Sequence, residues 1–348
     1  MNRTTLGRTG IEVSDYCLGT MTFGTQTSEP DSHTQIDMAL EAGIDFLDTA
    51  EMYPVNPVLA ETVGNTETII GNWNVKSGKR DQIVIATKHS GPNGAFVRPG
   101  QDISAATLRE TLEGSLRRLQ TDYVDLYQFH WPNRGSYHFR QNWDFAPDKQ
   151  PATDAILDNM AEVMDELAAL VAEGKIRAFG LSNDSAWGTM QWLNAAKAAG
   201  GPRVATMQNE YSLLSRLYDT DLAELGNHED VTLLAFSPLA CGYLTGKYRG
   251  GSIPKGSRKS INEGMGGRTS PRVNEVVEVY AAIADKYGVD LTHMALQWTL
   301  TRPFPTIPIF GATTTQQLAH ILKAPSVELP DELLAEVSKA HRANPMPF

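Results

Sequence analysis

Eight short apolar segments alternate with segments of helical periodicity along the chain, and this alternation limits the possible folds more than any other feature. Strict alternation of strand and helix predicts a parallel sheet with helices packed against it. Eight such units in 348 residues, without a break in composition, favour a single α/β domain over residues 1–348 that forms a closed (β/α)8 barrel, or TIM barrel. The predicted strands are residues 16–21, 44–48, 83–88, 124–130, 177–182, 204–208, 233–237 and 306–311.

An open, doubly wound sheet is the main alternative to the barrel. Its dinucleotide-binding form carries a Gly-x-Gly-x-x-Gly turn after the first strand, and no such turn follows residues 16–21. The barrel is therefore favoured. Around it we expect an N-terminal β-hairpin over residues 3–14, a helix that Asp31 caps and that runs to Glu41, and a C-terminal helix.

Composition and charge exclude several classes of function. The formal charge of −11 and the isoelectric point near 5.2 argue against a nucleic-acid surface, which needs a basic patch. No apolar run reaches the roughly 18 residues of a membrane span, and the N-terminus has no apolar signal core, so we expect a cytoplasmic protein. The cysteines and histidines show no metal-ligand spacing, so no metal site is expected. The sequence leaves the oligomeric state open.

Residues capable of proton transfer stand at the ends of three successive predicted strands. Asp48, Lys88 and His130 end the second, third and fourth strands, and Tyr53 follows the second. In a (β/α)8 barrel the carboxyl ends of the strands meet at one mouth, where the chemistry of such enzymes takes place. We therefore expect these four side chains to be neighbours although they are distant in sequence.

These residue types suit the reduction of a carbonyl group. A tyrosine with a pKa of about 10 is a weak acid at neutral pH, and we expect the ammonium group of Lys88 to lower that pKa. Asp48 is expected to hold Lys88 in a buried ion pair, and His130 to donate a hydrogen bond to the substrate oxygen. Side chains cannot donate a hydride, so the reaction needs a donor such as nicotinamide.

Each of these residues also has a simpler interpretation. Asp48 could be a cap at a strand end, and His130 could be a core histidine whose ring bonds to the backbone. Lys88 could lie on the surface, or it could be the Schiff-base nucleophile of an aldolase. The residues by themselves leave these alternatives open.

Five segments together resemble motifs of the aldo-keto reductase superfamily. They span residues 48–53, 86–88, 122–130, 174–183 and 236–248, and the resemblance extends over about residues 3–340. Residues 19–24, 50–54 and 71–73 are most similar to the bacterial Tas-like branch, and the potassium-channel β-subunit group is a more distant relative. The resemblance implies a (β/α)8 barrel with a nicotinamide cofactor extended across its mouth.

The resemblance also implies roles for individual residues. Asp48, Tyr53, Lys88 and His130 match the catalytic tetrad of the family, with Tyr53 as the proton donor. A longer set matches its cofactor-binding positions. Ser182, Asn183 and Gln208 match the positions that hold the nicotinamide carboxamide, residues 237–241 match those that line the pyrophosphate, and others continue to the adenosine end. The whole set is Gly19, Thr20, Met21, Asp48, Ser182, Asn183, Gln208, Phe236, Ser237, Pro238, Leu239, Ala240, Cys241, Lys247, Arg258, Gly311, Thr313 and Gln317.

The adenosine end of this set bears on the choice of cofactor. Arg258 and the hydroxyl group of Thr313, which is expected at a helix start, favour NADP(H), with NAD(H) as the alternative. Many relatives continue the following helix with Glu-Asn, whereas this chain has His320 and Ile321. We therefore expect the adenine contacts to differ from those of many relatives.

The resemblance says less about the substrate. Phe23, Met52, Trp131 and the loop 131–153 are expected to line a pocket for hydrophobic or aromatic carbonyl compounds, and the loop 250–268 is expected to close over the cofactor. The implied function is an NADPH-dependent oxidoreductase that interconverts aldehydes or ketones and alcohols, with no nucleic-acid or membrane partner. The alternative is a cofactor-sensing regulatory or adaptor protein on the same fold.

Overall fold

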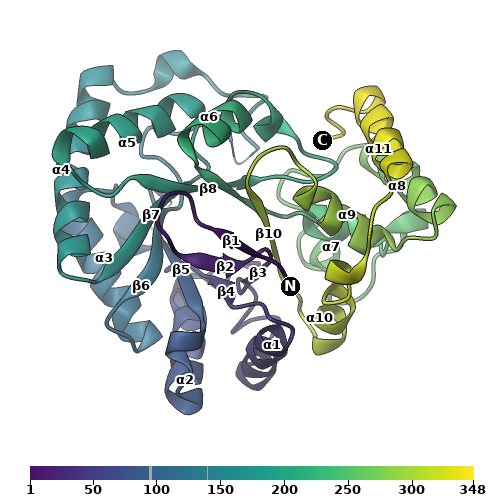
Figure 1. Cartoon of the computed structure of the whole chain (residues 1–348), viewed down its shortest axis with the longest axis horizontal. Coiled ribbons are helices and arrows are strands. Elements are labelled where there is room, and N and C mark those ends of the chain that lie inside the picture. The colour runs from purple at the N-terminus through teal and green to yellow at the C-terminus, as the bar shows by residue number, and fades with distance from the viewer. Residues whose placement is uncertain (94–95, 139) are drawn as a thin grey trace.

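The chain folds into a closed barrel of eight parallel strands, as seen in a computed structural model that describes residues 1–93, 96–138 and 140–348 (Figure 1). Around the barrel the strand order is β10-β3-β4-β5-β6-β7-β8-β9. This arrangement confirms the predicted (β/α)8 barrel. The strands are β3 (Cys17–Gly19), β4 (Phe46–Asp48), β5 (Val84–His89), β6 (Val124–Phe129), β7 (Ile176–Ser182), β8 (Val204–Glu210), β9 (Thr232–Phe236) and β10 (Thr306–Phe310).

Helices surround the barrel, and the last of them is the predicted C-terminal helix (Figure 1). Among the described residues, no helix has both the length and the apolar character that crossing a membrane requires. The helices are α1 (Glu29–Glu41), α2 (Asn65–Ser77), α3 (Ala105–Leu119), α4 (Thr153–Ala172), α5 (Ala186–Ala199), α6 (Asp221–Glu229), α7 (Arg258–Ile261), α8 (Val273–Lys286), α9 (Leu291–Leu300), α10 (Thr315–Ile321) and α11 (Asp331–Ala343).

The predicted N-terminal hairpin consists of the antiparallel strands β1 (Arg3–Thr5) and β2 (Glu12–Ser14), which lie across one end of the barrel (Figure 1). Buried side chains of the hairpin region, Leu6, Ile11 and Val13, form one apolar cluster with barrel residues that include Cys17 and Phe46. The hairpin therefore covers the end of the barrel at which the strands begin, and the carboxyl ends of the strands form the opposite mouth.

The first helix, α1, begins earlier than the sequence predicted. Ser28, not Asp31, is its N-cap, because the Ser28 hydroxyl oxygen accepts a hydrogen bond from the Asp31 backbone N–H at 3.3 Å. Asp31 instead lies in the first turn, where a negative charge interacts favourably with the helix dipole. The prediction of Asp31 as the cap was wrong, because Ser28 offers the same type of cap three residues earlier.

The barrel register aligns the polar residues at the mouth. Gly19 in β3 pairs with Asp48 in β4, and Asp48 pairs with Ala86 in β5. Lys88 in β5 pairs with Gln128 in β6. Because all eight strands are parallel, residues at their carboxyl ends lie around the same mouth.

Helices α2 and α3 approach each other most closely at Gly71. A Cβ atom at this position would lie 2.1 Å from the backbone carbonyl oxygen of Arg118 and 2.8 Å from the carbonyl carbon of Leu119. The side chain of Asn74 donates a hydrogen bond to the Leu119 carbonyl oxygen at 2.9 Å and holds the end of α3 in place. Only glycine, which has no Cβ atom, allows the two backbones to lie this close together.

We expect Gly71→Ala to lower the free energy of unfolding by about 1–3 kcal/mol, because overpacking outweighs the gain in helix propensity of about 1 kcal/mol. Gly114→Ala in α3 is the matched control, since its nearest neighbour is the flexible Arg118 Nη1 atom at 3.2 Å. That variant should be unchanged or slightly more stable. Chemical denaturation measures both, and equal stabilities would contradict the close approach at Gly71.

Candidate active site

The four predicted catalytic residues lie together at the barrel mouth. Asp48 ends β4, Lys88 lies in β5, and His130 directly follows β6. Lys88 Nζ donates a hydrogen bond to Asp48 Oδ2 at 2.7 Å and lies 3.5 Å from the Tyr53 hydroxyl oxygen. Lys88 is fully buried and Asp48 is 3% exposed. The fold therefore builds one cluster from residues that are separated in sequence.

The Asp48–Lys88 ion pair is supported by further hydrogen bonds. Lys88 Nζ also donates to the Thr49 carbonyl oxygen at 2.7 Å. Asp48 Oδ1 accepts from Gln208 Nε2 at 2.7 Å and from Gln128 Nε2 at 3.4 Å. A buried ion pair is favourable only when such bonds satisfy its remaining atoms. Gln128 was not predicted, because a single glutamine within an apolar strand matches no motif.

The environment determines which of these groups are charged. Burial is the largest single effect on Lys88 and opposes its charged form, but the Asp48 carboxylate and the Tyr53 hydroxyl group together outweigh burial and raise the pKa of Lys88. Burial also raises the pKa of Tyr53, although Lys88 acts in the opposite direction. Lys88 therefore acts on the pKa of Tyr53 in the expected direction, but the net shift of that pKa is upward. Desolvation is the larger effect, and it keeps the Tyr53 phenol protonated at neutral pH.

His130 lies against Tyr53 at the mouth. The two rings are in edge-to-face contact with centroids 5.7 Å apart, and the centroid of the Trp131 ring lies 4.8 Å from that of His130. Burial and the nearby Lys88 hold the pKa of His130 well below its ordinary value, so the imidazole is neutral. Its buried Nδ1 atom has no hydrogen-bond partner among the described residues. This finding argues against a core histidine satisfied by the backbone.

The residues predicted to hold the nicotinamide carboxamide lie beside the ion pair. Asn183 Nδ2 donates to the His130 carbonyl oxygen at 2.9 Å, and Ser182 Oγ donates to the Gln208 carbonyl oxygen at 2.7 Å. The buried Asn183 Oδ1 has no partner among the described residues. An orphaned acceptor of this kind fits an amide N–H group of a ligand. The Gln208 amide is engaged by Asp48.

The loop after β9 forms the region predicted to hold the pyrophosphate. It begins after Phe236, and Ser237, Ala240 and Cys241 all have positive φ angles of 53°, 47° and 55°. Three non-glycine residues with positive φ this close together are uncommon, and strained backbone of this kind occurs at functional sites. Pro238 and Leu239 complete the loop.

Two cationic side chains lie next to this loop. The guanidinium group of Arg258, in α7, contacts Cys241 Sγ at 3.4 Å and Met21 Sδ at 3.6 Å. Burial and the charge of Arg258 lower the pKa of Lys247. Within the part of the chain that the structure describes, neither cation forms an ion pair with a carboxylate, so both are free to bind a phosphate group.

The barrel strand β3 ends beside the barrel strand β10. The Thr20 hydroxyl group donates to the Asp48 carbonyl oxygen at 2.8 Å. A Cβ atom on Gly19 would lie 2.9 Å from Ile309 Cγ2, and one on Gly311 would lie 3.0 Å from the Gly19 carbonyl oxygen. The two glycines therefore permit a close approach of β3 to the end of β10.

Thr313 and Gln317 contact each other at the predicted adenosine end. The backbone N–H and the hydroxyl group of Thr313 both lie 3.0 Å from Gln317 Oε1. Thr313 is not the helix cap, because Thr314 caps α10 and accepts from the Gln317 backbone N–H. The helix cap therefore lies one residue later than predicted, at Thr314 and not at Thr313.

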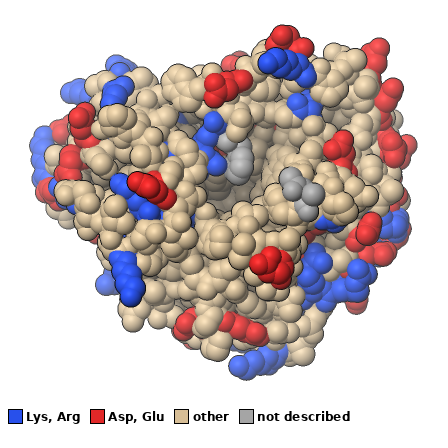
Figure 2. Space-filling view, turned by 180° about the vertical axis from the view of Figure 1, so that it is seen from behind, with Lys and Arg blue, Asp and Glu red and all other residues tan. Residues whose placement is uncertain are grey.

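The mouth of the barrel is hollowed at its centre (Figure 2). Met52 and Trp131 belong to one small apolar cluster together with Tyr53, and Trp131 Nε1 donates to the Pro92 carbonyl oxygen at 2.7 Å. Phe23, in contrast, is fully buried in the main core. Of the loop 131–153, residue 139 lies outside the described residues, and Trp143 is 67% exposed.

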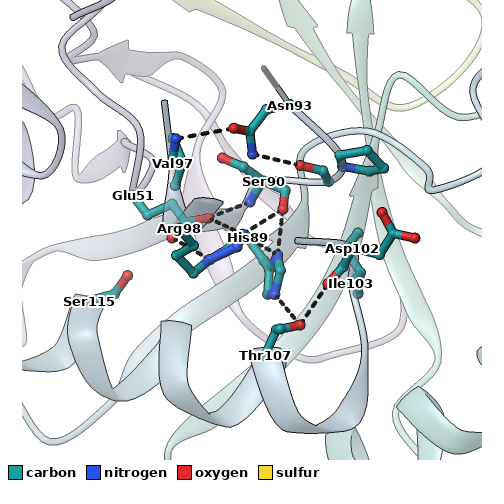
Figure 3. Close-up of polar contacts among 12 residues, drawn as sticks. Glu51, His89, Ser90, Asn93, Val97, Arg98, Asp102, Ile103, Thr107 and Ser115 are labelled. Atoms are coloured by element: carbon teal, nitrogen blue, oxygen red, sulfur yellow. Dashed lines mark hydrogen bonds and ion pairs between the residues drawn. The ribbon is translucent and has the colours of Figure 1, made fainter. Parts of the chain in front are cut away.

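A buried polar network around Glu51 was not predicted (Figure 3). Glu51 Oε1 accepts hydrogen bonds from the Ser90 backbone N–H at 2.7 Å and from Arg98 Nη2 at 2.8 Å. Arg98 Nη2 also donates to the Ser90 carbonyl oxygen at 2.7 Å. Burial raises the pKa of Glu51 to about 7 despite Arg98. The network ties the segment before Tyr53 to the loop after β5, and Glu51 was its only signal in the sequence.

A second unpredicted ion pair anchors the loop after β6. Arg134 and Asp184 are both almost fully buried and form a salt bridge. A Cβ atom on Gly188 would lie 2.1 Å from Arg134 Nη2, so a glycine is needed beside the pair. The loop that begins at Trp131 is thus fixed to the end of β7, next to Asn183.

The chain is similar to known proteins over nearly its whole length. The profile of the Aldo/keto reductase family matches residues 16–342. Protein tas of Escherichia coli is 42% identical over 340 residues, which cover 97% of this chain and 96% of that protein. The uncharacterized oxidoreductase YrpG of Bacillus subtilis is 32% identical over 349 residues, covering 96% and 94% of the two chains. These matches show that the chain is an oxidoreductase and belongs to the aldo/keto reductase family.

Proposed function

We propose that the protein is an NADPH-dependent oxidoreductase that interconverts carbonyl compounds and alcohols, with Tyr53 as the general acid and base. The observation that supports this most directly is the position of the Tyr53 hydroxyl oxygen, 3.5 Å from the buried ammonium group of Lys88. The His130 ring lies beside it at the mouth. A protonated phenol next to a fixed positive charge suits proton donation to a developing alkoxide.

Each residue of the cluster has a separate part in this mechanism. Tyr53 donates its hydroxyl proton to the carbonyl oxygen during reduction and accepts it back during oxidation. Lys88 stabilises the resulting phenolate by its charge, and Asp48 keeps Lys88 charged and oriented. Neutral His130 donates a hydrogen bond that positions the substrate oxygen. A bound nicotinamide supplies or accepts the hydride.

Several features fit a dinucleotide phosphate cofactor. Asn183 offers a buried, unpartnered Oδ1 for the carboxamide. The loop around Ser237 contains residues with positive φ, and backbone N–H groups in turns of this kind can bind a pyrophosphate. Arg258 and Lys247 provide positive charge without carboxylate partners in the described structure. A planar guanidinium suits a phosphate monoester, which supports NADPH over NADH. Met52 and Trp131 favour hydrophobic or aromatic carbonyl substrates.

Two alternative functions receive less support. A Schiff-base aldolase needs a neutral lysine, whereas Lys88 donates to Asp48, Thr49 and Tyr53, and its pKa is raised. A cofactor-sensing adaptor does not require the complete set of four residues that this chain has. Binding of NADPH by the wild-type protein without turnover on a broad panel of aldehydes, ketones and alcohols would favour the adaptor.

Removal of the Tyr53 hydroxyl group tests the mechanism. We expect Tyr53→Phe to lower kcat at least about 100-fold, since the proton donor is lost, with unchanged folding and NADPH affinity. Steady-state kinetics and a fluorescence titration with NADPH measure these quantities. Tyr123→Phe, before β6 and thus at the opposite end of the barrel, is the control. Near-wild-type turnover by Tyr53→Phe contradicts the assignment.

The charge of Lys88 should set the pH dependence of alcohol oxidation, which requires deprotonated Tyr53. Lys88 lowers the pKa of Tyr53 against the effect of burial. Lys88→Met should therefore raise that pKa further and move the residual oxidation activity to higher pH. The measurement is the pH profile of kcat, with Lys76→Met on the exposed side of α2 as the control. An unchanged profile, or a shift to lower pH, argues against this role.

Arg258 should discriminate between the two cofactors. We expect Arg258→Met to raise the Kd for NADPH by roughly 10- to 100-fold, as expected for the loss of charge-assisted hydrogen bonds. The Kd for NADH should change much less. Lys259→Met removes the neighbouring charge and serves as the control. Fluorescence titrations with both cofactors measure these Kd values. An equal rise in the Kd for NADPH and for NADH rules out recognition of the 2′-phosphate by Arg258.

A further inference from the structure

Two histidines and an aspartate meet where the first turn of α9 contacts the last turn of α10. Asp290 is the N-cap of α9, His293 lies in the first turn of the same helix, and His320 lies in the last turn of α10. Asp290 Oδ1 is 3.3 Å from His320 Nε2 and 3.9 Å from His293 Nδ1. One nitrogen or oxygen atom from each residue lies within 4.8 Å of the other two.

The hydrogen bond of His293 determines which of its nitrogens faces this cluster. Its Nε2 atom lies 2.8 Å from the His320 carbonyl oxygen. A carbonyl oxygen only accepts, so Nε2 carries the proton and the neutral ring presents a lone pair at Nδ1. That lone pair and the Asp290 carboxylate are therefore two acceptors that face each other. A cation between them would be bound by both groups, in place of the direct approach of 3.9 Å between Asp290 Oδ1 and His293 Nδ1.

The surroundings resemble those of metal-binding histidines. Such histidines usually donate their other ring N–H to a backbone carbonyl or a carboxylate, which fixes the tautomer and the ring, as His293 does here. The His293 and His320 rings are stacked, with centroids 4.6 Å apart. The His293 side chain is only 9% exposed, whereas those of Asp290 and His320 are 41% and 46% exposed. The site thus combines a buried, oriented ligand with access from solvent.

We propose that Asp290, His293 and His320 bind a divalent cation of the zinc class that joins α9 to α10. Two imidazoles and one carboxylate suit Zn²⁺ and related transition metals, whereas Mg²⁺ and Ca²⁺ prefer sites made of oxygen ligands. Tetrahedral ligands at bond lengths of about 2.0–2.1 Å lie about 3.3 Å apart, so the distances of 3.3 and 3.9 Å from Asp290 Oδ1 to the two imidazole nitrogens need only a small adjustment. Water completes the coordination.

This proposal departs from the expectation that the chain has no metal site. Asp290 and His293 are three residues apart, but His320 is 27 residues beyond His293, so no ligand spacing is visible in the sequence. The fold alone brings the three side chains together.

Metal titration of the full chain, freed of purification tags and treated with a chelator, tests the site. We expect one equivalent of Co²⁺ to give the visible absorption of a tetrahedral complex, Zn²⁺ to displace it, and Zn²⁺ but not Mg²⁺ to raise the Tm. A wild-type protein whose spectrum and Tm do not respond to Co²⁺ or Zn²⁺ overturns the proposal.

Matched variants locate the metal. Asp290→Asn and His320→Gln should each weaken Co²⁺ binding at least about 10-fold, a loss typical even of residues that only orient a ligand. Asparagine is as good an N-cap as aspartate, so Asp290→Asn keeps α9 intact. His228→Gln removes an exposed histidine of α6 and should leave binding unchanged. Equal affinity in the wild type, Asp290→Asn and His320→Gln would place the metal elsewhere and refute the assignment.

Discussion

The buried ion pair between Lys88 and Asp48 is the interaction on which the mouth of the barrel depends. Transfer of two charges from water into the interior is unfavourable, and the loss of one partner of such a pair costs about 3–5 kcal/mol. Lys88 is fully buried, and the pair remains favourable because Thr49, Gln128 and Gln208 satisfy its other hydrogen bonds. The same bonds connect β4, β5, β6 and β8. Stability and proton chemistry therefore rest on one set of contacts.

Around this pair, buried charges also hold the loops that shape the site. Glu51 and Arg98 connect the segment before Tyr53 to the loop after β5, and Arg134 connects the loop after β6 to Asp184. Loops held in this way lose less conformational freedom when a ligand binds, which favours binding. Ion pairs between these loops therefore help to fix the shape of the mouth, together with the strands.

Burial decides the protonation states of the groups at the mouth. It raises the pKa of Tyr53 and lowers that of His130, so both rings are neutral beside a charged Lys88. In the proposed mechanism, the neutral rings donate hydrogen bonds to a substrate oxygen, and the ammonium group stabilises the phenolate that forms as Tyr53 gives up its proton. On the outer layer, Asp290, His293 and His320 form the cluster at which we propose a bound cation, so imidazole and carboxylate groups also come together outside the mouth.

The sequence by itself determined the barrel, the hairpin, the C-terminal helix and the four residues at the mouth, because strand and helix periodicities and strand-end motifs are local patterns. The position of the α1 cap was wrong, since two residues offered the same local signal. Only the tertiary structure decided the pKa direction of Tyr53, the partners of Asp48 and the meeting of His293 with His320. Desolvation and contacts between distant segments depend on all the atoms that surround a group, and no local pattern contains them.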